Sequence, residues 1–417
     1  MREISIIENN KRKIIKKPEL LAPAGSLEKL KFAVLYGADA VFIGGKEFSL
    51  RARASNFSLD DIKEAVDFAK DHGSKVYVTT NIIPHNENLE NLETYLKGLY
   101  EAGVAAIICA DPYIVSTARR VVPNLELHLS TQQSITNSKG IEFWLNNGVS
   151  RVVLARELTM DEIKDVSDNT EGDLEVFIHG GMCVSYSGRC TLSNNMTDRD
   201  ANRGGCAHSC RWNYSLYSKS GGNDHLLSDE TIPFSMSSKD LMAVNHIPGL
   251  IECGVDSLKI EGRMKSIHYI ATVVGTYRKL IDDYCENPDD FELTDYYLQE
   301  IAKAENRLTA EGFLSGEPSV NEQLYNMRSE QPTQEFIGIV RDYDEETGYV
   351  TVEQRNKFIP GEEIEFNAPG MVKYNLIVDK IFDEEFNELD AARHPRQILK
   401  LKVPFKLRPY TIVRRKR

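Results

Sequence analysis

Residues 40–80 read AVFIGGKEFSLRARASNFSLDDIKEAVDFAKDHGSKVYVTT, and this stretch decides the fold. Two short β-rich apolar runs, AVFIG at Ala40–Gly44 and KVYVTT at Lys75–Thr80, flank the helical pattern LDDIKEAVDFAKDHG. Ser58 precedes that pattern as a helix N-cap with acidic residues in the first turn, and Gly73 closes it. The stretch therefore predicts a strand–helix–strand unit.

The same alternation continues on both sides of this unit. Eight apolar runs alternate with helical patterns over about 260 residues, which predicts a (β/α)8 barrel. A doubly wound open sheet is the alternative, but no Gly-x-Gly-x-x-Gly follows the first run. A barrel places its chemistry at the C-terminal ends of the strands. The predicted strands are Glu19–Ala24, Ala40–Gly44, Lys75–Thr80, Ala105–Ala110, Leu125–Ser130, Arg151–Ala155, Leu174–His179 and Ser257–Glu261.

The composition is that of a soluble globular protein. The chain has 417 residues, of which 41% are hydrophobic and 27% charged. No apolar run approaches the roughly 18–20 residues that span a bilayer, and the first residues lack the apolar core of a signal peptide. Seven cysteines are too few, and odd in number, for a disulfide scaffold. We therefore expect a cytoplasmic protein with no membrane partner.

Three segments follow from the changes in composition along the chain. Residues 1–17 form a basic N-terminal extension, and residues 18–330 form the (β/α)8-type catalytic domain with a helical C-terminal segment. After Gln331-Pro332 the pattern alternates like strands, with turns at 346–348 and 360–362. Residues 333–417 are therefore predicted to be a small all-β barrel of five to seven strands with a basic tail.

The charge distribution suggests a nucleic-acid partner in spite of a net charge of -13. Residues 391–417 hold ten Lys and Arg residues and no acidic residue. A basic end on an acidic body is a candidate phosphate-binding arm. A solvated tail that keeps the protein soluble is the alternative. We assign candidate RNA-binding roles to Arg414, Arg415, Lys416 and Arg417.

A long loop, residues 180–235, separates the seventh strand from its helix and contains Cys183, Cys190, Cys206 and Cys210. Long loops inside compact domains are usually functional. The spacing C-x6-C-x15-C-x3-C suits an iron–sulfur cluster or a zinc ion held by four thiolates. Zinc sites more often use C-x2-C pairs, which are absent here, so an iron–sulfur cluster is favoured and zinc is the runner-up. Ordinary packing explains Cys109, Cys253 and Cys285.

The segment EVFIHGGMCVSYSGRCTLS at Glu175–Ser193 resembles the signature of the collagenase-like peptidases, family U thirty-two. Gly181 stands where that signature usually has Ser or Ala. ELLAPAG, GADAVFIGG and LKIEGRMKS (Leu258–Ser266) also resemble family segments, and the resemblance covers essentially the whole chain.

The length and the single small C-terminal barrel resemble the tRNA hydroxylation protein P branch of this family. That resemblance implies 5-hydroxylation of the wobble uridine of tRNA, with prephenate as a co-substrate. It also implies a [4Fe–4S] cluster on the four loop cysteines, and a paralogous family member is a possible partner.

Two other functions compete with tRNA hydroxylation. The family name implies a peptidase, but the sequence has no Gly-x-Ser-x-Gly elbow and no His-Glu-x-x-His. Cys183 and His179 are close enough in sequence for a Cys–His dyad, although a thiolate bound to iron cannot attack a peptide. The third reading is a non-catalytic RNA-binding protein with a structural cluster.

The hydroxylase hypothesis assigns roles to side chains at the predicted strand ends. A dicarboxylate such as prephenate needs guanidinium groups, and a uracil base needs stacking and edge hydrogen bonds. Each assignment competes with a purely structural role. A lone Arg can form a surface salt bridge, and His179 can be a core histidine whose hydrogen bonds are satisfied within the protein. Candidate substrate-binding residues are Arg51, Arg53, Asn56, Phe57, Asn81, Gln132, Arg156 and Arg263. Candidate catalytic residues are His179, Glu261 and Tyr186.

Overall fold

Eight parallel strands close into a barrel in the computed structural model of the chain, which describes residues 4–8, 11–50, 56–220, 223–227, 234–304, 307–324 and 332–417. Strand β13 pairs with β3 on one side and with β9 on the other, which closes the ring. The barrel prediction is therefore confirmed, and the open-sheet alternative is wrong. The strands are β3 (Glu19–Pro23), β4 (Ala40–Gly44), β5 (Lys75–Thr80), β6 (Ala106–Cys109), β7 (Glu126–Leu129), β8 (Arg151–Val153), β9 (Asp173–Gly180) and β13 (Ser257–Ile260).

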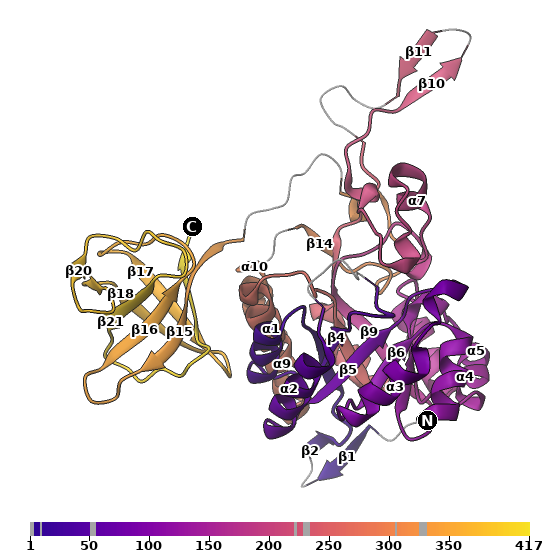
Figure 1. Cartoon of the computed structure of the whole chain (residues 1–417), viewed down its shortest axis with the longest axis horizontal. Coiled ribbons are helices and arrows are strands. Elements are labelled where there is room, and N and C mark those ends of the chain that lie inside the picture. The colour runs from indigo at the N-terminus through magenta and orange to yellow at the C-terminus, as the bar shows by residue number, and fades with distance from the viewer. Residues whose placement is uncertain are drawn as a thin grey trace.

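Helices surround the barrel (Figure 1). Ser58 and Thr159 form capping boxes with Asp61 and Glu162, which fixes where α2 and α6 begin. In the part of the chain that the structure describes, no helix is long and apolar enough to cross a bilayer. The helices of the barrel domain are α1 (Leu27–Leu35), α2 (Leu59–Asp71), α3 (Leu92–Glu101), α4 (Pro112–Val121), α5 (Ser138–Asn146), α6 (Met160–Asp168), α8 (Ile247–Glu252), α9 (Ile267–Glu286) and α10 (Asp295–Ala302).

The barrel interior contains charged side chains that are paired with one another. Lys259 Nζ lies 2.6 Å from Glu175 Oε1, and both side chains are buried. Arg151 Nη1 lies 2.7 Å from Glu19 Oε1. Because a buried charge is tolerated only with a partner, these pairs specify how β3, β8, β9 and β13 face one another. A separate apolar cluster on β3 to β6 consists of Leu21, Ala40, Phe42, Tyr77, Ala106 and Ile108.

The basic N-terminal segment is held against acidic side chains of the barrel domain. Strands β1 (Ser5–Glu8) and β2 (Lys11–Ile14) form a hairpin. Arg12 Nη1 lies 2.9 Å from a Glu252 carboxylate oxygen, and Lys16 forms an ion pair with Asp256. The positive charge of this segment is thus partly neutralised by the body of the protein.

The cysteine-containing segment, residues 181–239 and called the insertion below, leaves the barrel at β9 and returns beside it. Strand β12 (Asp240–Met242) runs antiparallel to β9, with Leu241 opposite Gly180. In Figure 1 the insertion covers one end of the barrel, and a hairpin projects from it. Its other elements are η3 (Tyr186–Gly188), α7 (Leu192–Thr197), η4 (Ala201–Arg203), η5 (Ser209–Arg211), β10 (Tyr217–Ser220) and β11 (Asn223–Leu226), where η denotes a 3₁₀ helix.

The helical segment after the barrel is shorter than predicted. Helix α10 ends at Ala302. Among described residues 307–324 the regular elements are β14 (Thr309–Ala310) and η7 (Val320–Glu322). Strand β14 pairs in parallel with β12, so this stretch extends the sheet beside the insertion.

The C-terminal domain is an antiparallel sheet of eight strands around its own apolar core, which includes Ile337, Phe366 and Val413. The predicted all-β domain is confirmed, although eight strands exceed the expected five to seven. The order is β18-β17-β22-β15-β16-β21-β19-β20. The strands are β15 (Gln334–Tyr343), β16 (Tyr349–Gln354), β17 (Glu363–Ala368), β18 (Val372–Ile377), β19 (Ile381–Phe382), β20 (Glu388–Leu389), β21 (Ile398–Lys402) and β22 (Ile412–Lys416).

The basic end of the chain is a strand of this sheet and not a tail. Strand β22 lies between β15 and β17. Arg414 is fully buried, and Arg415 forms ion pairs with two carboxylates of the same domain. The prediction that Arg414 binds an RNA phosphate is wrong, because its side chain is fully buried. The RNA-binding role of Arg415 stays a prediction, although its charge already has carboxylate partners. Lys416 and Arg417 are exposed, so their RNA-binding role stays a prediction.

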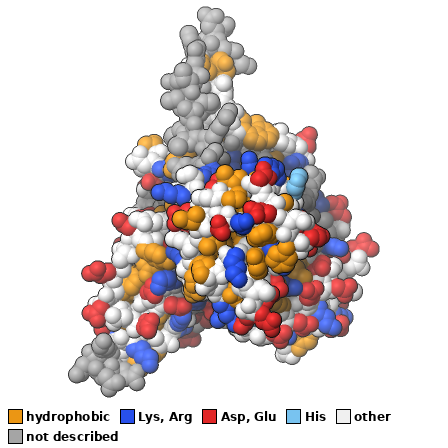
Figure 2. Space-filling view, turned by 90° about the vertical axis from the view of Figure 1, so that its left-hand side faces the viewer, with side chains coloured by type: hydrophobic (Ala, Val, Ile, Leu, Met, Phe, Trp, Pro, Cys, Tyr) orange, Lys and Arg blue, Asp and Glu red, His pale blue; other side chains and the backbone are white. Residues whose placement is uncertain are grey.

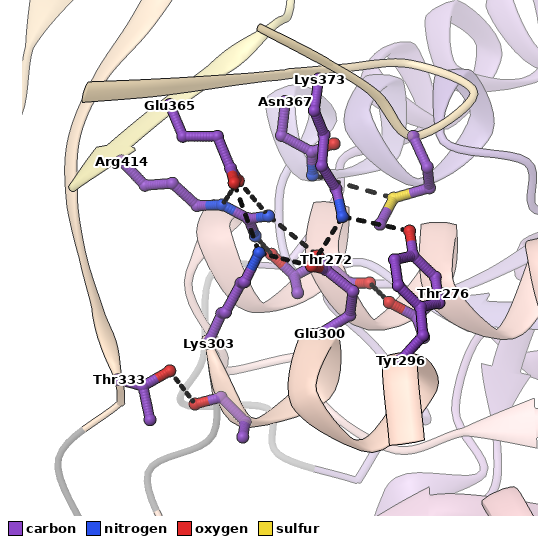
Figure 3. Close-up of polar contacts among 12 residues, drawn as sticks. Thr272, Thr276, Tyr296, Glu300, Lys303, Thr333, Glu365, Asn367, Lys373 and Arg414 are labelled. Atoms are coloured by element: carbon purple, nitrogen blue, oxygen red, sulfur yellow. Dashed lines mark hydrogen bonds and ion pairs between the residues drawn. The ribbon is translucent and has the colours of Figure 1, made fainter. Parts of the chain in front are cut away.

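Arg414 joins the two domains through buried polar contacts (Figure 3). Its Nη2 donates to Glu300 Oε2 at 2.9 Å on α10, and its Nε donates to Glu365 Oε1 at 2.6 Å on β17. Its Nη1 donates to the Thr272 hydroxyl at 3.1 Å on α9. Lys373 Nζ approaches Glu300 to 2.6 Å from β18. One guanidinium therefore bridges three elements across the interface.

A second group of contacts seats the C-terminal domain on α1 and α9. The Tyr36 hydroxyl donates to Asn367 O at 2.6 Å and accepts from the Ile412 N–H at 3.2 Å. A Cβ at Gly275 would lie only 2.4 Å from Met371 Sδ, so the glycine permits this close approach. The interface is thus fixed by both hydrogen bonds and close packing.

Candidate active site

Two amide side chains meet at the C-terminal end of the barrel, as the strand-end prediction requires. Asn81, after β5, donates from Nδ2 to Gln132 Oε1 at 2.8 Å. The same oxygen accepts from the Ser130 hydroxyl at 3.0 Å. Gln132 is only 3% exposed, and its Nε2 has no hydrogen-bond partner among the described residues. A buried donor without a partner is costly, which favours a ligand at this point.

Arg156 lies at the same end of the barrel, after β8. Its guanidinium carbon is 3.8 Å from the centre of the Phe177 ring, and its Nη1 donates to Gly181 O at 2.6 Å. Its Nε is buried without a partner among the described residues. Stacking on the ring fixes the guanidinium plane, so the remaining N–H groups are held in position for an anionic or carbonyl ligand.

Arg263, after β13, forms hydrogen bonds with the segment that follows β4. Its Nη1 donates to the Ser49 and Thr79 hydroxyls at 3.1 and 3.2 Å, and its Nη2 donates to Leu50 O. Its path requires Gly44, because a Cβ there would lie 1.9 Å from Arg263 Nη1. Arg263 is buried and holds the segment after β4. Its predicted binding of a substrate carboxylate stays a prediction.

Of the other residues predicted to bind substrate after β4, the structure describes Asn56 and Phe57. Arg51 and Arg53 lie outside the described residues. Asn56 is half-buried. Its neighbour Phe57 is buried, and the Phe57 N–H donates to Gly44 O at 3.0 Å. Asn56 is therefore held next to the C-terminal end of β4.

The His179 side chain contacts helix α9. A register shift between β9 and β13 places it opposite Ile260. Its Nδ1 lies 3.2 Å from the Tyr277 hydroxyl on α9, and burial lowers the pKa of its imidazole to about 3. An imidazole with so low a pKa is a weak base near neutral pH, which disfavours the predicted proton-transfer role. That role stays a prediction. Glu261 is half-buried just beyond β13, and its carbonyl accepts from the Tyr269 hydroxyl at 3.2 Å.

Tyr186 is carried over the barrel mouth by the insertion. Helix η3 contacts η2 (Thr131–Gln133), which carries Gln132. The Tyr186 side chain is 55% exposed. Partial burial and the nearby Glu157 and Glu162 carboxylates raise the pKa of its hydroxyl. The hydroxyl therefore keeps its proton at neutral pH and is available as a hydrogen-bond donor.

Glu157 anchors the insertion, a role that the sequence reasoning did not assign to this strand-end residue. Its carboxylate accepts from the Ser187 N–H at 2.6 Å and from the Ser187 hydroxyl at 2.5 Å. On another side of the insertion, Arg203 forms an ion pair with Glu87. The available signal for Glu157 was its place at a strand end directly after Arg156. These contacts hold the insertion on the barrel.

Cys183, Cys190 and Cys206 lie close enough to Cys210 to act on its thiol electrostatically. Cys183 and Cys206 are exposed, whereas Cys190 and Cys210 are half-buried. Burial raises the pKa of the Cys210 thiol, Arg211 lowers it, and the other three cysteines raise it further. All seven cysteines of the chain are free. Four thiols from one loop thus gather beside the barrel mouth.

The donor set suits a metal centre, although the thiols do not form a closed site. The Leu192 N–H donates to Cys190 Sγ at 3.3 Å, the type of contact that stabilises a thiolate ligand. Within the described ranges, no three His, Cys, Asp or Glu side chains are grouped so as to hold a metal ion. Cys109 is buried in β6, where burial raises its pKa to about 12. It is therefore no ligand candidate.

A groove of about 570 Å³ lies beside these thiols. Ile83 and His85, in the loop after β5, line one part of it. Arg189, Cys190 and Asn195 of the insertion line another. The volume is within the range of small-molecule and nucleotide sites. A ligand in this groove would touch the wall that carries Cys190.

Family models match both domains. Residues 25–324 match "Peptidase family U32", and residues 332–414 match "Peptidase family U32 C-terminal domain". The chain belongs to peptidase family U32. The family assignment agrees with the resemblance noted in the Glu175–Ser193 segment.

Two tRNA hydroxylation proteins are similar to this chain over nearly its whole length. The tRNA hydroxylation protein P1 of Bacillus subtilis is 54% identical over 414 residues, which cover 99% of this chain and 98% of that protein. The tRNA hydroxylation protein P of Haemophilus influenzae is 34% identical, with 93% and 94% covered. The crystal structure of a U32 C-terminal domain from Geobacillus thermoleovorans is 53% identical, covers 19% of this chain and 99% of that domain, and has a TM-score of 0.19.

Proposed function

We propose that this U32 protein is an enzyme that hydroxylates tRNA, with the wobble uridine converted to 5-hydroxyuridine. The observation that carries the proposal is the insertion, which brings four thiols to a barrel end that also bears Gln132 and Arg156. Similarity over almost the full length to a tRNA hydroxylation protein supports the same function. Hydroxylation at C5 replaces C–H by C–OH and is a two-electron oxidation, so it needs an oxygen donor and an electron acceptor.

Cys183, Cys190, Cys206 and Cys210 would hold a [4Fe–4S] cluster, with zinc as the alternative occupant. When bound, such a cluster supplies electron transfer at a potential set by its surroundings. The fit rests on the donor chemistry: four thiols in one loop, a backbone N–H on Cys190 Sγ, and the cationic Arg211 beside Cys210. The Arg211 side chain is itself positioned by a 3.2 Å hydrogen bond to Met182 O.

The barrel mouth would bind the small co-substrate and the hydrogen-bonding edge of the uracil base. The stacked guanidinium of Arg156 suits a carboxylate of prephenate. The unpartnered Nε2 of Gln132 suits a carbonyl oxygen of the base. Tyr186, with its raised pKa, would donate a hydrogen bond from the insertion side. A Cys–His peptidase dyad would need His179 to take the proton of a thiol, and an imidazole whose pKa burial lowers to about 3 is a poor acceptor for it.

The tRNA hydroxylase proposal is tested by nucleoside mass spectrometry of tRNA from a strain that lacks the gene. We expect loss of 5-hydroxyuridine and its derivatives, and recovery when the wild-type gene is restored. Recovery by a Cys190→Ser variant to wild-type levels would contradict a role for the cysteines. Unchanged tRNA in the deletion strain would refute the hydroxylase function itself.

The cluster proposal is tested on protein purified without oxygen. We expect a brown protein with broad absorbance at roughly 400 nm. Replacing any one of the four loop cysteines by Ser should lose iron, whereas Cys109→Ala should retain it. A colourless preparation with one zinc per chain would replace the cluster by the zinc alternative.

A further inference from the structure

The insertion exposes an unusual number of large apolar side chains. Tyr186, Trp212 and Tyr217 are 55%, 41% and 59% exposed. Exposed apolar groups gathered on one segment mark a binding surface. Strands β10 and β11 project from the body as an isolated hairpin (Figure 1), and such hairpins are marginally stable alone in water. Other exposed apolar residues of the insertion are Val184, Met196, Leu216 and Leu227.

The local charge of the insertion is opposite to that of the chain. Its first part, residues 181–220, contains five Lys and Arg residues and two acidic residues, a net charge of +3. Over all of residues 181–239 the net charge is +1, whereas the whole chain carries a net charge of -13. Arg189 is exposed on the wall of the groove beside Cys190. None of the described carboxylates forms an ion pair with Arg189. A polyanion is therefore attracted to the insertion more than to the acidic remainder.

The C-terminal domain does not offer a comparable surface on the face shown in Figure 2. There, Lys and Arg side chains are interspersed with Asp and Glu. Two of its cations, Arg414 and Arg415, are used in ion pairs within the protein. Two cations of the insertion, Arg203 and Arg211, also have carboxylate partners, which leaves Arg189 as the exposed cation beside the groove. Positive charge combined with exposed aromatic rings is found on the insertion.

We propose that the insertion is the RNA-docking surface, on which unpaired nucleotides of the substrate stack on Tyr186, Trp212 and Tyr217. Surfaces that bind single-stranded nucleic acid combine cations along the backbone with rings on which bases stack. The proposal rests on the proposed function, in that RNA is the substrate. It places the RNA beside the cysteines, and not on the C-terminal strand where sequence reasoning placed it.

The groove beside Cys190 takes one nucleotide of this RNA. Arg189 binds its phosphate, and the Asn195 side chain on the same wall offers amide groups to the base. Its volume of about 570 Å³ accommodates a nucleotide. Docking there brings a base to the side of the insertion that faces the thiols.

The test measures tRNA binding by the full-length protein with a fluorescently labelled tRNA. We expect Trp212→Ala and Tyr217→Ala each to weaken binding about tenfold, since a stacked base contributes that order of affinity. Arg189→Ala should weaken binding and reduce the slope of log affinity against log salt by roughly 0.7–0.9. Iron content reports whether each variant keeps its insertion folded. Tyr217 lies farther along the chain from Cys210 than Trp212 does, so Tyr217→Ala is the variant less expected to disturb the cysteines.

Two matched controls lie on α5, away from the insertion. Phe143 is a 59% exposed aromatic residue, and Lys139 is an exposed cation. Phe143→Ala and Lys139→Ala remove an exposed ring and a positive charge without touching the proposed surface. We expect both variants to bind tRNA as the wild type does.

Three results would overturn the docking proposal. In the first, all insertion variants bind tRNA with wild-type affinity, and a Lys416→Ala/Arg417→Ala variant binds it more weakly. This result would place the RNA on the C-terminal domain. Another is a change of oligomeric state in Trp212→Ala with unchanged tRNA affinity, which would make the surface a self-association interface. The third is an equal loss of binding in the α5 controls. Wild-type protein that binds no tRNA, with unchanged tRNA in the deletion strain, would instead refute the proposed function.

Discussion

Replacing Arg414 by Met tests whether the C-terminal domain is locked to the barrel by a buried ion pair. The guanidinium is fully buried and contacts Glu300, Glu365 and Thr272. Removing one partner of a buried pair typically costs about 3–5 kcal/mol. Glu300 keeps Lys303 and Lys373 in the variant, so we expect the lower end, about 3 kcal/mol.

The neighbouring Arg415 provides the matched control. Its side chain is 24% exposed and pairs with Glu335 and Glu362. Exposed and half-exposed pairs contribute about 0–1 kcal/mol, so Arg415→Met should cost less than about 1 kcal/mol. Thermal unfolding followed by circular dichroism should show a fall of roughly 5 °C or more for Arg414→Met, and of roughly 2 °C or less for Arg415→Met.

The pH dependence gives a second readout of the same contact. Burial alone would raise the pKa of Glu300, but Arg414, Lys303 and Lys373 lower it to about 2. A depressed carboxyl pKa contributes stability that is complete above the unfolded pKa of about 4.5 and is lost as the pH falls towards 2. Without Arg414 the pKa is lowered less, so the wild-type and Arg414→Met stability curves should converge below pH 4.5.

Equal stabilities of Arg414→Met and Arg415→Met at pH 7 would refute this reasoning. So would parallel curves for the wild type and Arg414→Met between pH 5 and pH 2. Either result would mean that packing around Tyr36 and Met371 holds the domains together without help from the guanidinium.

Three further predictions concern the barrel mouth. Gly44→Ala should cost about 1–3 kcal/mol by overpacking a buried guanidinium, measured by denaturant unfolding, whereas Gly140→Ala in α5 should be neutral or stabilising. Arg156→Lys should raise the KM for the small co-substrate about tenfold in steady-state assays, because an ammonium lacks the planar face stacked on Phe177. His179→Gln should leave the pH–rate profile unchanged between pH 5 and 8, because burial lowers the pKa of the imidazole to about 3; an inflection lost in the variant would contradict this.

The barrel was predictable because each strand is a short apolar run between cap signals. Ser58 marked the start of α2, and it forms a capping box with Asp61. Eight closed strands follow from such local patterns. The number of strands in the C-terminal domain was underestimated, because β19 and β20 have only two residues each.

The sequence could not show the surroundings of a side chain whose partners are distant along the chain. In the sequence, Arg414 belongs to a basic end that would be solvated. Its buried partner Glu300 is 114 positions away. His179 lies on a strand end in sequence, but a register shift turns it towards α9. Arg263 reads as a free cation, yet Ser49 and Thr79 occupy its N–H groups. A one-dimensional pattern contains none of these pairings.

The way in which the insertion leaves and re-enters the barrel has an evolutionary consequence. Its two ends are held together by the pairing of β9 with β12, where Leu241 lies opposite Gly180. A loop with fixed, adjacent ends can gain or lose residues at little cost, because the entropy of closure grows only with the logarithm of its length. Relatives could therefore exchange or resize this segment, and so change which substrates they accept, while the barrel that carries it stays the same.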